Sequence, residues 1–129
     1  MSTAPAIRLN SIAQIAINVH DLGRAIEFYR DTLGLKFLFQ AGENLAFLDC
    51  DGVRLMLDIP PDPRFQHPSS IVYFNVGDIQ AAHQQLAARG VKFEEEPHVI
   101  ARLADREVWL AAFDDTEGNV MALMSETKI

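Results

Sequence analysis

The side chain in this sequence that could most readily take part in chemistry is His98, which follows an acidic run at residues 94–96. An imidazole titrates near pH ~6.5 and can transfer protons or bind a metal ion, and nearby carboxylates can attract a cation. A solvent-exposed histidine beside a solvated run of charges is the alternative, and it implies no function. The other histidines, which we expect at the surface, are His20, His67 and His83. No nucleophile elbow, phosphate-binding loop or Cys-His signature indicates a catalytic site.

Trp109 is the only tryptophan, and it offers a flat aromatic surface. Facing a ligand, it could contribute about 0.5–2 kcal/mol through a cation–π contact. Its predicted strand is apolar on both faces, so periodicity does not decide which face is inward, and a place in the core is the alternative. Cys50 is the only cysteine, which excludes an internal disulfide. We interpret it as a small packing residue beside a turn, with a reactive thiol as the alternative.

An internal repeat predicts the elements that position these residues. Val19-His20-Asp21-Leu22 opens a segment that closes with Gly34-Leu35-Lys36-Phe37. Val76-Gly77-Asp78-Ile79 opens a second segment, which closes with Gly90-Val91-Lys92-Phe93. Such self-similarity indicates two copies of one supersecondary unit.

Each copy reads as a βαβββ unit. In the first, alternation predicts strands at residues 12–19, 35–40, 45–49 and 53–59. Asp21 is expected to cap a helix with one apolar stripe, and Gly34 to end it. In the second, strands are predicted at residues 70–76, 91–93, 108–113 and 120–124, with a helix after Asp78. The unpatterned residues 94–106 are expected to form a loop. We place module one at about residues 10–60, a proline-rich connector at 60–68 and module two at about 69–126, within one domain spanning residues 1–129.

The composition restricts the class of protein. A chain of 129 residues with 49% hydrophobic and 22% charged residues is typical of one folded domain. The formal net charge of −7 disfavours nucleic acid and anionic membranes as partners. No segment is long and apolar enough to span a bilayer, and the first residues lack a signal-peptide pattern. A cytoplasmic protein is therefore expected.

The repeated pattern is similar to the vicinal oxygen chelate superfamily, which includes glyoxalase I, bleomycin-resistance proteins and extradiol dioxygenases. Further matching stretches are Ala-Ile-Glu-Phe-Tyr-Arg-Asp-Thr-Leu-Gly at residues 25–34 and Phe-Asp-Asp-Thr-Glu-Gly-Asn at residues 113–119. The second departs from the family's usual Asp-Pro-Asp-Gly-Asn turn at Thr116 and Glu117. The resemblance covers residues 12–125. It implies an α+β fold in which two βαβββ modules form a curved eight-stranded mixed sheet, with helices on the convex face and a ligand cavity on the concave face.

Alternation along the strands assigns side chains to these two faces. The set expected to face the helices is aliphatic or aromatic: Ile15, Ile17, Val19, Leu55, Leu57, Val72, Phe74, Val76, Met121 and Leu123. The opposite set is mixed and would line the cavity: Gln14, Ala16, Asn18, Arg54, Met56, Asp58, Ile71, Tyr73, Asn75, Val120, Ala122 and Met124. From this second set we predict ligand contacts by all residues but Ala16, Val120 and Met124. We also predict contacts by His98 and Trp109. Tyr73 with Arg54 or Asp58 could form an acid–base pair, or these polar groups could simply satisfy one another.

The resemblance also implies where metal ligands should stand. Metal-dependent members carry ligands, usually His or Glu, at four inward positions related by the repeat. The matching positions here are Gln14, Met56, Ile71 and Ala122. Only Gln14 offers an oxygen, whereas hard or borderline cations need several donors converging within ~2.0–2.6 Å. We therefore predict no metal and no other cofactor. A divalent metal would need a relocated site, such as Gln14 with His98 and a nearby glutamate.

These observations favour a metal-independent protein of the glyoxalase/bleomycin-resistance type that binds an unidentified small molecule, without catalytic residues. The alternative is a metal-dependent lyase, isomerase or dioxygenase with a non-standard site. A third possibility is a regulatory or interaction domain with a vestigial cavity. A homodimer is expected, because members of the family often build each cavity from two chains.

Overall fold

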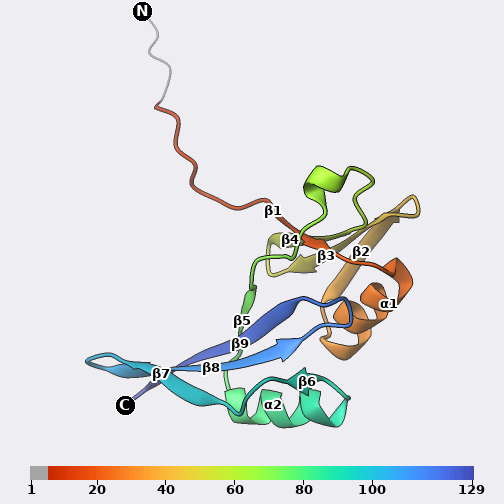
Figure 1. Ribbon diagram of the computed structural model, residues 1–129. Helices are drawn as coiled ribbons and strands as arrows, with labels where there is room; N and C mark the ends of the chain where they lie inside the picture. Colours follow the sequence, from red (N-terminus) through yellow and green to blue (C-terminus); the bar gives the residue numbers. More distant parts are fainter. Residues whose placement is uncertain (1–5) are drawn as a thin grey trace, which may run out of the picture.

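The computed structural model describes residues 6–129, which form two modules (Figure 1). The elements of the first are β1 (Gln14–Asn18), α1 (Leu22–Ile26), η1 (Glu27–Thr32), β2 (Lys36–Ala41), β3 (Leu45–Cys50) and β4 (Val53–Asp58). A short 3-10 helix, η2 (Pro63–Phe65), lies in the connector. The elements of the second are β5 (Tyr73–Asn75), α2 (Ile79–Ala88), β6 (Lys92–Phe93), β7 (His98–Arg102), β8 (Arg106–Asp114) and β9 (Val120–Lys128). The predicted α+β class is confirmed. The first module has the predicted βαβββ order, and the second has the same order with one additional strand, β7.

The strands form two mixed sheets. The four-stranded sheet has the order β1-β4-β3-β2, in which β1 and β4 are parallel and the other pairs antiparallel. The five-stranded sheet has the order β5-β9-β8-β6, with β7 also paired to β8. Within residues 6–129 no strand of one sheet pairs with the other sheet, so the expected continuous eight-stranded sheet is not formed. At the end of β1, the Asn18 backbone N–H donates to the Ser69 hydroxyl, and the Asn18 carbonyl accepts the Asn119 side-chain amide.

The helix ends follow the predicted chemistry. The Asp21 carboxylate accepts the Arg24 N–H at 3.0 Å, and the Asp78 carboxylate caps α2 by accepting the Ala81 N–H at 3.1 Å. Gly34 lies past the first helical segment with a φ of 83°, a conformation that costs glycine little. That segment widens at residues 27–32 into a π-helix, which the apolar periodicity alone did not indicate.

The helices and both sheets share one hydrophobic core. Fully buried strand residues such as Ile17, Leu57 and Met121 pack with α1, η1 and α2 residues in a single cluster. The assignment of the apolar strand set to the helix-covered face is therefore confirmed. Phe113 has no exposed surface and lies within 6.5 Å, between ring centroids, of Phe28 from the first module. The core thus joins the two modules.

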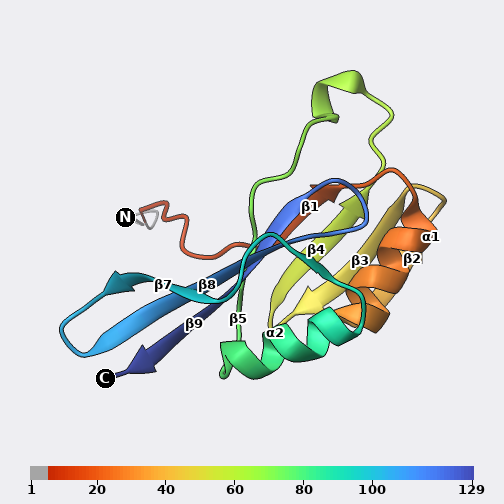
Figure 2. The ribbon, with the colours of Figure 1, turned by 60° about the horizontal axis from the view of Figure 1, so that its bottom comes forward.

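The expectation of a loop over residues 94–106 was wrong, because β7 occupies residues 98–102. This strand pairs antiparallel with β8 and has a register shift between Val99 and Ala101. The acidic run and Pro97 before the strand, and this irregularity within it, hid the alternation. Figure 2 shows β7, β8 and β9 extending together away from the first module. His83 is also half-buried rather than exposed, because its ring lies 4.3 Å from that of Phe93.

No helix within the described part of the chain is long and apolar enough to cross a membrane.

Candidate functional site

The helix-free face of the first sheet brings together five predicted ligand contacts. Strands β1 and β4 place Gln14 beside Arg54 and Asn18 beside Asp58, with Met56 between the two pairs. The Gln14 amide donates to the Met56 sulfur at 3.4 Å. Asp58 is partly buried, and this burial raises the pKa of its carboxyl group above the ordinary value. The face therefore combines two amides, a thioether and two groups of opposite charge.

A β-bulge adds an aromatic side chain to this face. Phe37 pairs with Leu48, but Phe39 pairs with Phe47, so Leu38 is an extra residue in β2. Regular alternation would place Phe37 and Phe39 on the same side of the sheet. The bulge instead leaves Phe37 against the core and stacks Phe39 on Phe47, with ring centroids 4.6 Å apart.

Arg54 completes a cluster with these two rings. Its guanidinium carbon lies 5.9 Å from the Phe39 ring centroid and 5.6 Å from that of Phe47, within cation–π range. We call Phe39, Phe47 and Arg54 the aromatic–arginine cluster. Arg54 was predicted as a ligand contact. Phe39 was missed because a bulge has no reliable sequence signal, and Phe47 was missed because the faces of β3 were not assigned.

The predicted contacts of the second module lie on the other sheet. Tyr73 and Asn75 are exposed on β5, and Tyr73 pairs in register with Ala122 of β9, which is buried. Ile71 precedes β5 and is 48% exposed. These residues and those around Arg54 therefore belong to two sheets that share no strand pairing in the described part of the chain. Among residues 6–129, no hydrogen bond joins Tyr73 to Arg54 or Asp58, as an acid–base pair would require.

His98 and Trp109 do not join either set. His98 is exposed on β7, where its Nδ1 lies 3.0 Å from the Glu96 carbonyl oxygen and its Nε2 lies 3.7 Å from Glu95. Trp109 is half-buried and packs against the core cluster. Alternation along β8 places Trp109 on the same side of the sheet as Ala111 and Phe113, which are both fully buried. A ligand contact from either residue stays a prediction.

The four positions implied for a metal do not fit one. Gln14 contributes an amide whose nitrogen contacts Met56, and Ile71 and Ala122 have no donor atom. A lone amide and a thioether do not match the oxygen and imidazole donors that zinc, iron or nickel sites use. Elsewhere in the described chain, no three His, Cys, Asp or Glu residues gather in a way that could hold a metal ion.

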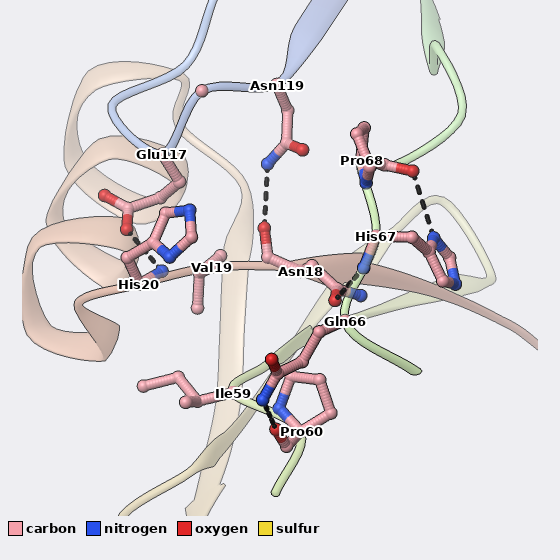
Figure 3. A pocket seen from close by; sticks show the side chains of 11 residues that line it. Asn18, Val19, His20, Ile59, Pro60, Gln66, His67, Pro68, Glu117 and Asn119 are labelled. Carbon is pink, nitrogen blue, oxygen red and sulfur yellow. Dashed lines mark hydrogen bonds between the residues drawn. The ribbon is translucent and has the colours of Figure 1, made fainter. Parts of the chain in front are cut away.

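A pocket of about 430 Å³ lies at the junction of the modules (Figure 3). It is bordered by the end of β1, the connector and the tip of the β8–β9 hairpin, and only Asn18 among the predicted contacts lines it. His67 also lines it, and its Nδ1 lies 3.0 Å from the Pro68 carbonyl oxygen. Because a carbonyl only accepts, Nδ1 must be the donor, which leaves Nε2 of a neutral His67 as an acceptor. The sequence analysis interpreted the proline-rich connector only as a linker between modules. Its residues form part of this pocket.

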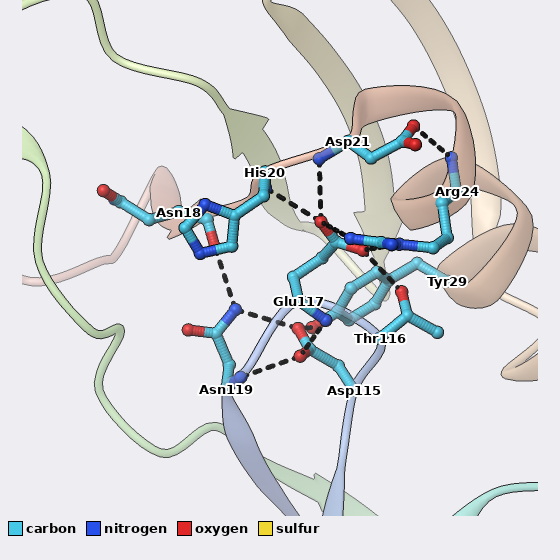
Figure 4. A network of polar contacts seen from close by, with 9 residues as sticks. All are labelled: Asn18, His20, Asp21, Arg24, Tyr29, Asp115, Thr116, Glu117 and Asn119. Carbon is cyan, nitrogen blue, oxygen red and sulfur yellow. Dashed lines mark hydrogen bonds and ion pairs between the residues drawn. The ribbon is translucent and has the colours of Figure 1, made fainter.

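One wall of the junction is formed by the buried carboxylate of Glu117 (Figure 4). It accepts the backbone N–H groups of His20 and Asp21, each at 2.8 Å. It also accepts the Arg24 Nε–H at 2.6 Å and the Thr116 hydroxyl at 2.8 Å. The turn that departs from the family's usual sequence therefore ties the second module to the start of α1.

Asp115 extends this network into the core. Its carboxylate accepts the Tyr29 hydroxyl at 2.7 Å and the backbone N–H groups of Glu117 and Asn119 at 2.7 and 2.8 Å. Asn119 in turn donates to the Asn18 carbonyl at 2.9 Å. Burial, followed by the negative charge of Asp115, raises the pKa of Tyr29 above its ordinary value. Each Glu117 and Asp115 oxygen is thus already bonded within the protein, which indicates a positioning role.

The protonation of Glu117 is expected to make stability depend on pH. Burial on its own raises the pKa of this carboxyl group, but the hydrogen bonds from Arg24, Asp21, Thr116 and His20 outweigh it and lower the pKa to about 2, from 4.5. A group whose pKa is lowered by folding stabilises the protein fully above its unfolded pKa, and this contribution disappears as the pH falls through the folded pKa. The contribution should reach about 3 kcal/mol above pH 4.5 and be lost towards pH 2.

Urea unfolding of the wild type and of Glu117→Gln between pH 2 and pH 6 measures this effect. The difference in free energy of unfolding should be constant above pH 5 and shrink as the pH falls. A difference that does not change over this range would show that the Glu117 carboxylate is not specially stabilised.

The chain matches known proteins over most of its length. The family model for the Glyoxalase/Bleomycin resistance protein/Dioxygenase superfamily matches residues 11–123. The uncharacterized protein YurT of Bacillus subtilis (strain 168) is 28% identical, over 89% of this chain and 98% of that protein. These matches cover both modules.

Solved structures show the same fold at lower sequence identity. A lactoylglutathione lyase from Agrobacterium tumefaciens is 22% identical with a TM-score of 0.69, covering 89% of this chain and 92% of the other. TnmS3, an antibiotic binding protein from Streptomyces sp. CB03234, is 21% identical with a TM-score of 0.74, covering 95% and 100%. One scaffold therefore serves an enzyme and a binding protein, and the likeness shows the fold alone.

Proposed function

Because the chain belongs to the Glyoxalase/Bleomycin resistance protein/Dioxygenase superfamily, we propose that it binds a small molecule without a metal ion. The proposed site is the helix-free face of the first sheet. The observation that carries the proposal is the aromatic–arginine cluster beside Gln14 and Met56. Apolar and aromatic walls with a few polar groups that fix orientation are typical of small-molecule sites.

The donor chemistry of the four implied metal positions supports the metal-independent form of this proposal. Isoleucine and alanine cannot coordinate an ion, and the single amide cannot hold one alone. The fold likeness to an antibiotic binding protein is consistent with a binding role, although it identifies no ligand. No observation at these positions favours the lyase, isomerase or dioxygenase alternative.

We also propose that the protein acts as a homodimer in the cytoplasm. In a single chain the helix-free face is open, with Phe39 45% exposed and Tyr73 of the second module 50% exposed. Covering these partly exposed side chains with a second copy would bury apolar surface, which favours association. A second copy could place its second-module face over the first-module face and so enclose the ligand.

A ligand screen by thermal unfolding in the presence of a chelator tests the proposed function. A ligand at about 100 times its Kd should stabilise the protein by about 2.7 kcal/mol, which corresponds to a rise of roughly 10 °C in Tm. Ala16→Trp fills the proposed face, since Ala16 is exposed on β1 beside Met56, and should abolish the rise. Ala104→Trp places the same side chain at an exposed position between β7 and β8 and serves as the control.

Ligands that stabilise the wild type but not Ala16→Trp would support the proposal. Ligands whose effect needs an added divalent ion, or survives Ala16→Trp, would contradict it. A screen in which no compound stabilises the wild type would also contradict the proposal.

A further inference from the structure

We propose that the ligand of this face is a planar aromatic anion, with its ring against Phe39 and its anionic group on the Arg54 guanidinium. This inference rests on the proposed function and adds the chemical class of the ligand. It is argued from the packing of the two rings, the lack of a partner for Arg54, and the position of the neighbouring polar groups.

The aromatic part of the argument concerns Phe47. Only 8% of its surface is exposed, yet it is not part of the core cluster that contains its neighbours Ala46 and Leu48. It is therefore buried on the opposite side of the sheet, where Phe39 and Arg54 cover it. Phe39 itself remains 45% exposed. The sheet thus presents a supported aromatic ring to solvent, a surface on which another planar ring can stack.

The anionic part of the argument concerns Arg54. Five other arginines pair with carboxylates: Arg24, Arg30, Arg64, Arg102 and Arg106. Within residues 6–129, no carboxylate lies within ion-pairing distance of Arg54, and its guanidinium makes no hydrogen bond, although the chain has 18 acidic residues. A guanidinium offers five N–H donors in a planar fork that matches a carboxylate, and contact with the rings restricts its orientation in advance.

The surroundings place both features within one ligand's reach. Arg54 lies beside Gln14 in the register of β1 and β4, and Met56 lies two residues further along the same face. The Arg54 guanidinium carbon lies 5.9 Å from the Phe39 ring centroid, so a bicyclic ring bearing a carboxylate spans the two groups. The net charge of −7 repels anions at long range, so selectivity for an anion must come from direct contact with Arg54.

Calorimetric titration with three matched probes tests the inference: 2-naphthoate, 2-naphthamide and 2-naphthylmethylammonium. The three share one ring system and differ in charge. The naphthoate should bind at least about tenfold more tightly than the amide, as a charge-assisted hydrogen bond predicts, and the ammonium should bind most weakly. Arg54→Gln should weaken the naphthoate about tenfold and leave the amide within about twofold. Phe39→Leu should weaken both probes.

Arg64→Gln is the matched control, because Arg64 also lies over a phenylalanine, 5.5 Å from the Phe65 ring centroid, but on the connector. It should leave all three affinities unchanged. Equal affinities for the naphthoate and the amide, a naphthoate affinity unaffected by Arg54→Gln, or no binding of any probe would overturn the inference.

The outcome is separable from that of the proposed function. If the probes fail while the ligand screen finds compounds that Ala16→Trp excludes, only the ligand class is wrong. If the screen itself finds none, the proposed function is wrong.

Discussion

Replacing Phe113 by alanine is expected to lower the free energy of unfolding by about 3–5 kcal/mol. Its side chain has no exposed surface, and its ring lies near those of Phe28, Phe74 and Phe93, at 6.5, 6.4 and 5.6 Å between centroids. These rings come from η1, β5 and β6, so the cavity would open where the modules meet. The loss combines the lost burial with the cost of a cavity that neighbouring aromatic rings cannot fill.

Denaturant unfolding measures this change, and Phe65→Ala is the control. Phe65 is 56% exposed on the connector, so its removal should change the free energy of unfolding by less than about 0.5 kcal/mol. A loss at Phe113 no larger than that at Phe65 would mean that the two modules do not share a core.

Replacing Glu117 by alanine is expected to cost about 2–4 kcal/mol near neutral pH. The change leaves the N–H groups of His20 and Asp21 without an acceptor and removes the partner of Arg24. The Arg24 side chain is half exposed and can be hydrated, so the cost should come mainly from the two backbone groups.

Chemical unfolding of Glu117→Ala beside Glu126→Ala isolates this contribution. The Glu126 side chain is 42% exposed and lies 3.9 Å from Arg106, so its loss should cost less than about 0.5 kcal/mol. Similar losses in the two variants would contradict a positioning role for Glu117.

Much of the fold could be predicted because its determinants are local and repeated. The caps at Asp21 and Asp78, and the glycine after the first helical segment, each act within a few residues of their position. The apolar face of each strand could also be predicted, since alternation along a strand requires no knowledge of distant contacts. The packing of the hydrophobic core confirmed the set of residues predicted to face the helices.

The rest depended on features that are not local. The bulges in β2 and β7 shift the alternation by one residue, and neither is marked by a glycine or proline within its strand. As a result, β7 was missed and Phe39 was not recognised on the face of Arg54. The contacts of Glu117 with residues near the start of α1 link positions 93–97 residues apart. The sequence showed only that the turn was unusual.

The candidate site was predicted in part for the same reason. Gln14, Arg54 and Met56 lie together because β1 and β4 are neighbours in one module. Tyr73 and Ala122 belong to the other sheet, and only the relative placement of the modules, or a second copy, decides whether the two groups share a ligand. That placement is set by tertiary contacts rather than by strand periodicity.

The central claim is that a small molecule binds, without a metal ion, on the first-sheet face around Arg54. Its most direct test is an NMR titration of chelator-treated, isotope-labelled protein with the best compound from the screen. We predict the largest shifts in the amide signals of Gln14, Phe39, Arg54 and Met56. Shifts centred instead on the junction pocket around His67, or shifts that occur only after a divalent ion is added, would contradict the account.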